Sequence, residues 1–105
     1  MIDNLDLLKE ELKRRITRIK FHPHFYYQIK KRPYLSEAMV KTILSDFNNY
    51  LGFQIQKVNG ESRYRIGVAL SRKYTFVIVL EVAEEHLNII TVWKTNRKWQ
   101  KSMQK

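Results

Sequence analysis

Apolar residues at the start of the chain recur at the spacing of an α-helix. They follow one another at intervals of three or four residues, so they share one stripe of a helical surface. This stripe consists of Leu5, Leu8, Leu12 and Ile16. Acidic side chains come early in the segment and basic side chains come late, an order that suits the helix dipole. We therefore predict a helix from about Asp3 to Arg15, with its charged face in solvent.

Proline positions divide the segment that follows. A short alternating stretch predicts a strand over about residues 18–21. Proline disfavours helical angles in the residue before it, but it suits the first turn of a helix. His22 is therefore a candidate cap for a short helix over residues 23–31, which ends before Pro33.

The next helix has clearer end signals. Ser36 is a good capping residue, and Leu35 just before it can pack onto Val40. The pair Asn48-Asn49 is expected to end this helix. Its predicted buried face consists of Val40, Ile43, Leu44 and Phe47.

The second half of the chain has the two-residue period of strands. Asn59-Gly60 predicts a tight hairpin, because both turn residues must accept positive φ. The strand after it, over about residues 62–69, has alternating faces: Tyr64, Ile66 and Val68 on one, and Arg63, Arg65 and Gly67 on the other. Residues 74–82 are apolar on both faces and predict a central strand, and residues 87–93 predict a further one.

Helices followed by a run of strands indicate the α+β class. We expect a single domain, 1–105, in which helices pack on one face of an antiparallel sheet of about four to five strands. The chain has 105 residues, which is the length of one domain.

Net charge is the property of the composition that says most about the binding partner. Twenty basic and ten acidic residues give a net charge of +10, which favours a polyanionic partner. The absence of cysteine excludes disulfides, thiolate zinc sites and cysteine nucleophiles. The longest nearly apolar run, 75–82, is far shorter than the ~20 residues of a membrane span, and the acidic N-terminus does not fit a secretory signal. We expect a cytoplasmic protein with no membrane partner.

Three groups of residues are candidates for chemistry. His22 and His24 could share a metal, but without a third ligand nearby a capping role or proton transfer is favoured, and we expect no metal. Arg63 and Arg65 lie on one face of one strand, where two guanidinium groups can bind a phosphate. A solvated sheet face explains the same pair equally well.

The third group is the basic, aromatic segment 93–99. Trp93 and Trp99 could stack on unpaired bases while Arg97 and Lys98 hold the backbone. The alternative is a core Trp93 followed by a frayed end. No phosphate-binding glycine loop, nucleophile elbow or plausible carboxylate pair is present, which argues against nucleotide-triphosphate hydrolases, glycosidases and two-metal nucleases.

Three stretches together resemble the RelE/ParE-like toxin superfamily, in particular small domains with an HxH motif related to RelE and BrnT-type toxins. Residues 19–40 hold an apolar strand, the His-Pro-His motif, a basic helix that ends in Arg32, and Leu35-Ser36 before the next helix. Residues 60–67 resemble the family's arginine-rich strand, and residues 89–94 its last strand. The core would span 16–97, with 1–15 as a helical addition and 98–105 as a basic tail.

The resemblance implies a compact sheet with two helices on one side. It also implies, for many members, metal-free cleavage of mRNA without a cofactor, often on the ribosome, and a protein antitoxin as partner. Other members poison gyrase. An acidic antitoxin would suit this basic chain.

For RNA cleavage without a metal, the chemical type of each candidate residue indicates the role that it would have. Arg63 and Arg65 would hold the phosphate, and His24 or Lys94 would transfer the proton of the attacking 2′-hydroxyl. The expected RNA contacts are Arg32, Trp93, Arg97, Lys98 and Trp99. Phe25 stands where the family pattern has a small residue, and Gln28 where it has an arginine, and both departures favour the alternative of a binding module that does not cut. A protein-interaction domain is a third alternative.

Overall fold

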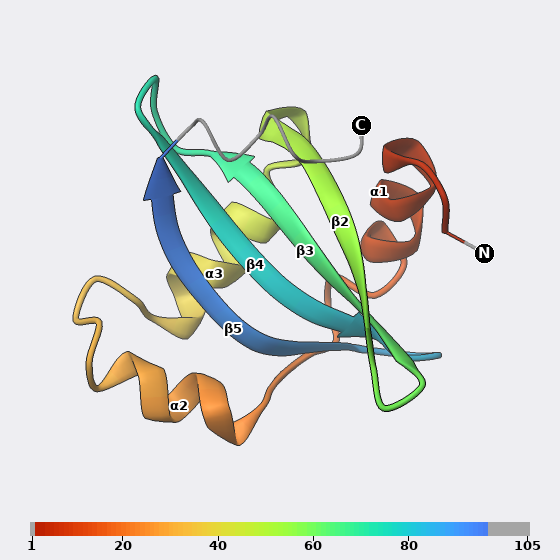
Figure 1. Ribbon diagram of the computed structural model, residues 1–105, viewed down its shortest axis with the longest axis horizontal. Helices are drawn as coiled ribbons and strands as arrows, with labels where there is room; N and C mark the ends of the chain where they lie inside the picture. The colour runs from red at the N-terminus through yellow and green to blue at the C-terminus, as the bar shows by residue number, and fades with distance from the viewer. Residues whose placement is uncertain (1, 97–105) are drawn as a thin grey trace.

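The structure is a computed structural model that describes residues 2–96 (Figure 1). Its helices within this range are α1 (Leu5–Lys13), α2 (Pro23–Ile29) and α3 (Glu37–Leu44), and a 3₁₀ turn covers Phe47–Asn49. The strands are β1 (Ile19–Phe21), β2 (Tyr50–Val58), β3 (Glu61–Ala69), β4 (Tyr74–Val82) and β5 (Leu87–Asn96). The predicted α+β class is confirmed.

The five strands form one sheet in the order β1-β5-β4-β3-β2. Strands β2 to β5 are an antiparallel meander, as predicted, because short turns join each strand to its neighbour. Strand β1 instead runs parallel to β5, with Ile19 opposite Leu87 and Phe21 opposite Ile89. The sheet is therefore mixed. Helices, and not a hairpin, link β1 to the other strands, so no tight turn forces β1 to run antiparallel to its neighbour.

Local sequence signals explain the helix starts. The side chains of Asn4, His22 and Ser36 each accept a hydrogen bond from a backbone N–H of the following turn, so the predicted caps His22 and Ser36 are confirmed. Helix α3 ends at Leu44, earlier than predicted. There the Tyr50 hydroxyl donates to the Leu44 carbonyl oxygen at 2.5 Å, and this contact ties the end of α3 to the start of β2.

The hairpin between β2 and β3 has the predicted turn. Asn59 and Gly60 both have positive φ, 52° and 82°. The sheet register that follows places Tyr64, Ile66 and Val68 on the buried face, as the alternation predicts. Arg63 and Arg65 therefore leave the opposite face.

One hydrophobic core lies between this sheet face and the helices. Every helix contributes to it: Leu8 and Leu12 from α1, Phe25 from α2, and Val40 and Leu44 from α3. Helix α3 passes behind the sheet in Figure 1, so the view is onto the opposite face. Among residues 2–96, no helix has the length and apolar character needed to cross a membrane.

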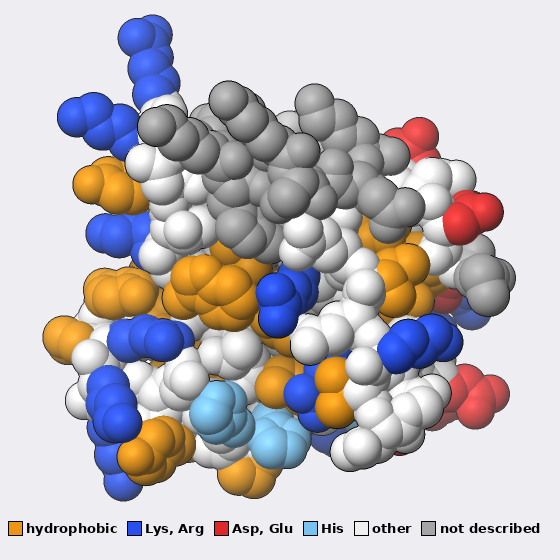
Figure 2. All heavy atoms as spheres, in the orientation of Figure 1, with side chains coloured by type: hydrophobic (Ala, Val, Ile, Leu, Met, Phe, Trp, Pro, Cys, Tyr) orange, Lys and Arg blue, Asp and Glu red, His pale blue; other side chains and the backbone are white. Residues whose placement is uncertain are grey.

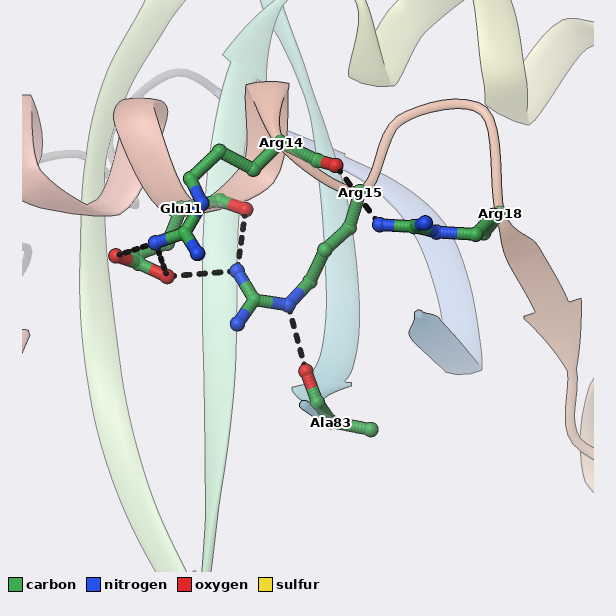
Figure 3. Close-up of polar contacts among 5 residues, drawn as sticks. All are labelled: Glu11, Arg14, Arg15, Arg18 and Ala83. Atoms are coloured by element: carbon green, nitrogen blue, oxygen red, sulfur yellow. Dashed lines mark hydrogen bonds and ion pairs between the residues drawn. The ribbon is translucent and has the colours of Figure 1, made fainter. Parts of the chain in front are cut away.

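Arg15 fastens α1 to the turn between β4 and β5 (Figure 3). Its Nε donates to the carbonyl oxygen of Ala83 at 2.6 Å, and its Nη1 donates to the carbonyl oxygen of Glu11 at 2.8 Å. Nη1 also lies 2.6 Å from the Glu11 carboxylate. Arg15 is 8 % exposed, so these acceptors compensate for the water that its guanidinium loses.

This contact predicts a pH-dependent stability. The hydrogen bond from Arg15 lowers the pKa of Glu11 below its ordinary value of 4.5. Because the pKa is lower in the folded state, the stabilisation is present above the unfolded pKa and is lost as the pH falls through the folded pKa. We expect Glu11→Gln to lower the free energy of unfolding at neutral pH, and we expect its difference from wild type to shrink in acid. Urea denaturation across this range measures the effect.

The matched control is Glu10→Gln, at an exposed position of the same helix. Its difference from wild type should stay small at every pH. An equal pH dependence in both variants would show that net charge alone, and not the Arg15 contact, is responsible.

Candidate nucleic-acid interface

A pocket of about 420 Å³ opens on the sheet face opposite the core. It unites three predicted site residues, His24, Arg63 and Arg65, with Trp93, a predicted RNA contact. The remaining lining residues are His22, Gln56, Val79, Ile90 and Thr91. Figure 2 shows this face, with two histidine side chains next to each other on its lower part and a Lys or Arg side chain beside them. No described lining residue is acidic.

Strand alternation brings the two arginines together. Arg63 and Arg65 are separated by the buried Tyr64, so both side chains leave the same face of β3. Their neighbours across β2 are Gln56 and Gln54, which carry no charge. Helix α2 lies beside β5 and supplies the histidines from its N-terminal end.

The two arginines differ in how their charges are compensated. Arg63 Nε lies 3.4 Å from the Glu81 carboxylate, and Glu81 also accepts from Asn88 at 3.2 Å. Arg65 has no carboxylate within ion-pair distance in the described part of the chain, and its buried Nε has no hydrogen-bond partner there. A buried unpaired N–H is costly, so Arg65 is the stronger candidate to bind an anion.

His22 has a fixed role as the cap of α2. Its Nδ1 accepts from the backbone N–H of His24 at 3.1 Å. A backbone N–H can only donate, so neutral His22 carries its proton on Nε2. This leaves one N–H donor of His22 in the pocket lining.

Gln28 determines which nitrogen of His24 is protonated. The Gln28 Oε1 accepts from the Thr91 hydroxyl at 2.8 Å and from Arg32 Nη1, so the amide nitrogen is the end that faces His24. This nitrogen lies 2.9 Å from His24 Nε2. Because the amide nitrogen donates, Nε2 accepts, and neutral His24 carries its proton on Nδ1.

Arg32 has a structural role here. Besides Gln28, its Nη1 donates to the Val92 carbonyl oxygen at 2.7 Å, so the guanidinium links the end of α2 to β5. Arg32 does not line the pocket. The expectation that it contacts RNA therefore finds no support in its position.

Lys94 is not part of the pocket. Its neighbour Trp93 lines the pocket, so Lys94 leaves the opposite face of β5. Its ammonium lies 5.5 Å from the ring centroid of Tyr34 and 4.9 Å from that of Tyr74. It is therefore separated from Arg65 by the sheet and cannot share a substrate phosphate with it. The other expected RNA contacts, Arg97, Lys98 and Trp99, lie outside the described residues.

Several residues in and beside the pocket were given no role in the site by sequence reasoning. Gln28, which lies beside the pocket, contacts His24 and accepts from the Thr91 hydroxyl, and Gln56 pairs with Arg63 across the two strands. The spacing of four residues between His24 and Gln28, one helical turn, was the available signal for their contact. Thr91 and Gln56 carry no such signal, because their place depends on strand register. Within residues 2–96, no cluster of three or more His, Asp or Glu side chains could hold a metal ion.

No known protein-family model, no curated protein and no solved structure matches this chain.

Proposed function

We propose that the protein is a metal-independent endoribonuclease that binds one phosphodiester of a single-stranded RNA in the pocket. The observation that carries this proposal is the meeting of His22, His24, Arg63 and Arg65, from separate parts of the chain, in one pocket. Trp93 adds an aromatic surface beside them. Guanidinium groups bind phosphate oxygens in pairs, and imidazoles transfer protons near neutral pH.

The reaction follows from the chemistry of RNA itself. The 2′-hydroxyl oxygen attacks the adjacent phosphorus, an O2′–P bond forms, and the P–O5′ bond breaks. The products are a 2′,3′-cyclic phosphate and a 5′-hydroxyl end. Arg65, with Arg63, would stabilise the negative charge that grows on the phosphoryl oxygens.

His24 is the proposed base, because its Nε2 is held unprotonated by Gln28. The 2′-hydroxyl takes the place of the Gln28 amide as the donor to this nitrogen. His22 carries its proton on Nε2, so it can stabilise the leaving 5′-oxygen by donating a hydrogen bond to it. The leaving 5′-oxygen takes its proton from water, and the proton that His24 removed from the 2′-hydroxyl returns to the solvent.

RNA incubated with the protein in EDTA, with and without ribosomes, tests the proposal. We expect cleavage, with 2′,3′-cyclic phosphate ends detected by mass spectrometry. A 2′-deoxy substitution at the cleaved nucleotide should block the cut, because it removes the nucleophile. Intact RNA in both conditions would contradict a nuclease.

Binding without cleavage is the second candidate function. The observation that favours it is the hydrogen bond from Gln28 to His24 Nε2, which occupies the lone pair that a base needs. Salt-sensitive gel retardation of RNA without any cutting would identify this function.

The cellular role we propose is that of a RelE-like toxin in the cytoplasm. Its support is the resemblance of residues 16–97 and the net charge of +10, which suits an acidic antitoxin. Co-expression with the product of a neighbouring gene tests this role. A small acidic protein that co-purifies and blocks RNA cleavage would support it, and a neighbour that does neither would count against it.

A further inference from the structure

Exposed tyrosines and lysines form two cation–π groups outside the pocket. Tyr27, Tyr34 and Tyr74 are 58 %, 44 % and 45 % exposed. Lys31 Nζ lies 4.6 Å from the Tyr27 ring centroid, and Lys94 lies near both of the other rings. We call these five residues the tyrosine–lysine strip. Figure 2 shows apolar or aromatic side chains among Lys and Arg side chains down the left margin of the pocket face.

The charges of this strip are not compensated within the described residues. Neither Lys31 nor Lys94 forms an ion pair with a carboxylate of residues 2–96. The turn before Tyr74 adds the exposed Arg72 and Lys73, so the area is cationic throughout. Tyr26 differs, because its hydroxyl donates to the Glu37 carboxylate at 3.0 Å.

The fold places the strip next to the pocket. Trp93 lines the pocket, and Lys94, the next residue of β5, belongs to the strip. The pairing of β1 with β5 extends only to Ile89, so among the described strands the last part of β5 is an edge of the sheet. Arg32 links α2 to this strand at the Val92 carbonyl oxygen, so a chain bound at Trp93 would cross the edge beyond Val92 to reach Tyr34 and Tyr74.

We propose that the tyrosine–lysine strip binds the nucleotides of single-stranded RNA that flank the phosphodiester in the pocket. This inference rests on the proposed function and extends its RNA path. Bases stack on the exposed ring surfaces, and the ammonium groups bind the backbone phosphates beside them. Single-stranded RNA is the occupant that fits, because it combines flat, unpaired bases with one negative charge per nucleotide.

The experiment measures binding of a labelled 2′-O-methyl oligouridine of about 12 nucleotides, a length within reach of typical single-strand sites. This probe cannot be cleaved, because its 2′-oxygen is blocked. We expect the double variant Tyr34→Leu/Tyr74→Leu to weaken binding at least about tenfold in fluorescence anisotropy. Tyr34→Phe/Tyr74→Phe should bind like wild type, because the rings remain.

Tyr26→Leu is the matched control, since Tyr26 is exposed at 46 % but paired with an acid. It should bind within about twofold of wild type. Circular dichroism and thermal unfolding of each variant show that the fold is kept. An oligomer with the same backbone but no bases should bind much more weakly to wild type and be insensitive to the leucine pair.

The outcomes separate this inference from the nuclease proposal. If the leucine pair binds like wild type while Arg65→Ala binds more weakly, the strip is not an RNA surface, and the pocket proposal stands. If the leucine pair weakens binding but no RNA is ever cleaved, the strip is supported, and the nuclease is contradicted. If wild type does not bind the probe, or binds the base-free oligomer equally well, stacking on the strip is wrong.

Discussion

Replacing Arg65 with alanine is expected to lower the rate of RNA cleavage by about 10²–10³-fold, the usual effect of removing one well-placed oxyanion donor. The reason is that Arg65 has no described carboxylate partner and a buried Nε without a hydrogen bond, so its charge is available to a bound phosphate. Single-turnover cleavage of a short RNA in EDTA measures this effect. The fold should be retained, because the side chain leaves the sheet face away from the core.

Two further variants test whether the loss of RNA cleavage is specific to Arg65. Arg63→Ala should cost less activity than Arg65→Ala, because Arg63 is partly neutralised by Glu81 at 3.4 Å. Arg14→Ala, which removes an exposed charge at the C-terminal end of α1, should leave cleavage nearly unchanged. Equal losses in all three variants would indicate a general effect of net charge and would remove the special role of Arg65.

Replacing Phe25 with alanine is expected to lower the free energy of unfolding by about 3–5 kcal/mol. Phe25 is fully buried, and its ring centroid lies 4.6 Å from that of Phe21. It is the one buried residue of α2, so its loss also releases the helix that carries His22 and His24. RNA binding should fall together with stability. Urea denaturation and the oligouridine assay measure the two effects.

Phe25→Leu keeps most of the apolar volume and should cost about 1–2 kcal/mol, which keeps the experiment interpretable if the alanine variant does not fold. Tyr27→Ala is the control on the same helix, because Tyr27 is exposed, and it should change stability by less than about 1 kcal/mol. Full RNA binding in a folded Phe25→Ala protein would show that α2 does not position the pocket histidines.

Local patterns predict most elements of this fold because each depends on neighbours in the chain. The cap at Ser36, the hairpin at Asn59-Gly60 and the alternation along β3 all act over a few residues. The end of α3 was placed too late, because it depends on Tyr50, which lies outside the predicted helix. The direction of β1 also had no local signal, since its partner β5 follows more than sixty positions later.

In the candidate site, too, strand alternation could be read from the sequence wherever two residues lie on one strand. Arg63 and Arg65 could be paired from the sequence, because a period of two places both on one face of a strand. The same rule applied to β5 separates Trp93 from Lys94, and it excludes Lys94 from a pocket lined by Trp93. Both residues were selected for their chemical type, without asking which face of the strand each side chain occupies.

By itself, the sequence determined the α+β class, the hairpin, the paired arginines of β3 and the cationic character of the surface, because these depend on composition and on spacings within one element. Only the tertiary structure decided that His24 meets Arg65, that Glu81 compensates Arg63, and that Thr91 orients the Gln28 amide toward His24. These contacts join strands and helices distant in sequence. Their geometry is determined by sheet register and by the packing of α2, which no local pattern encodes.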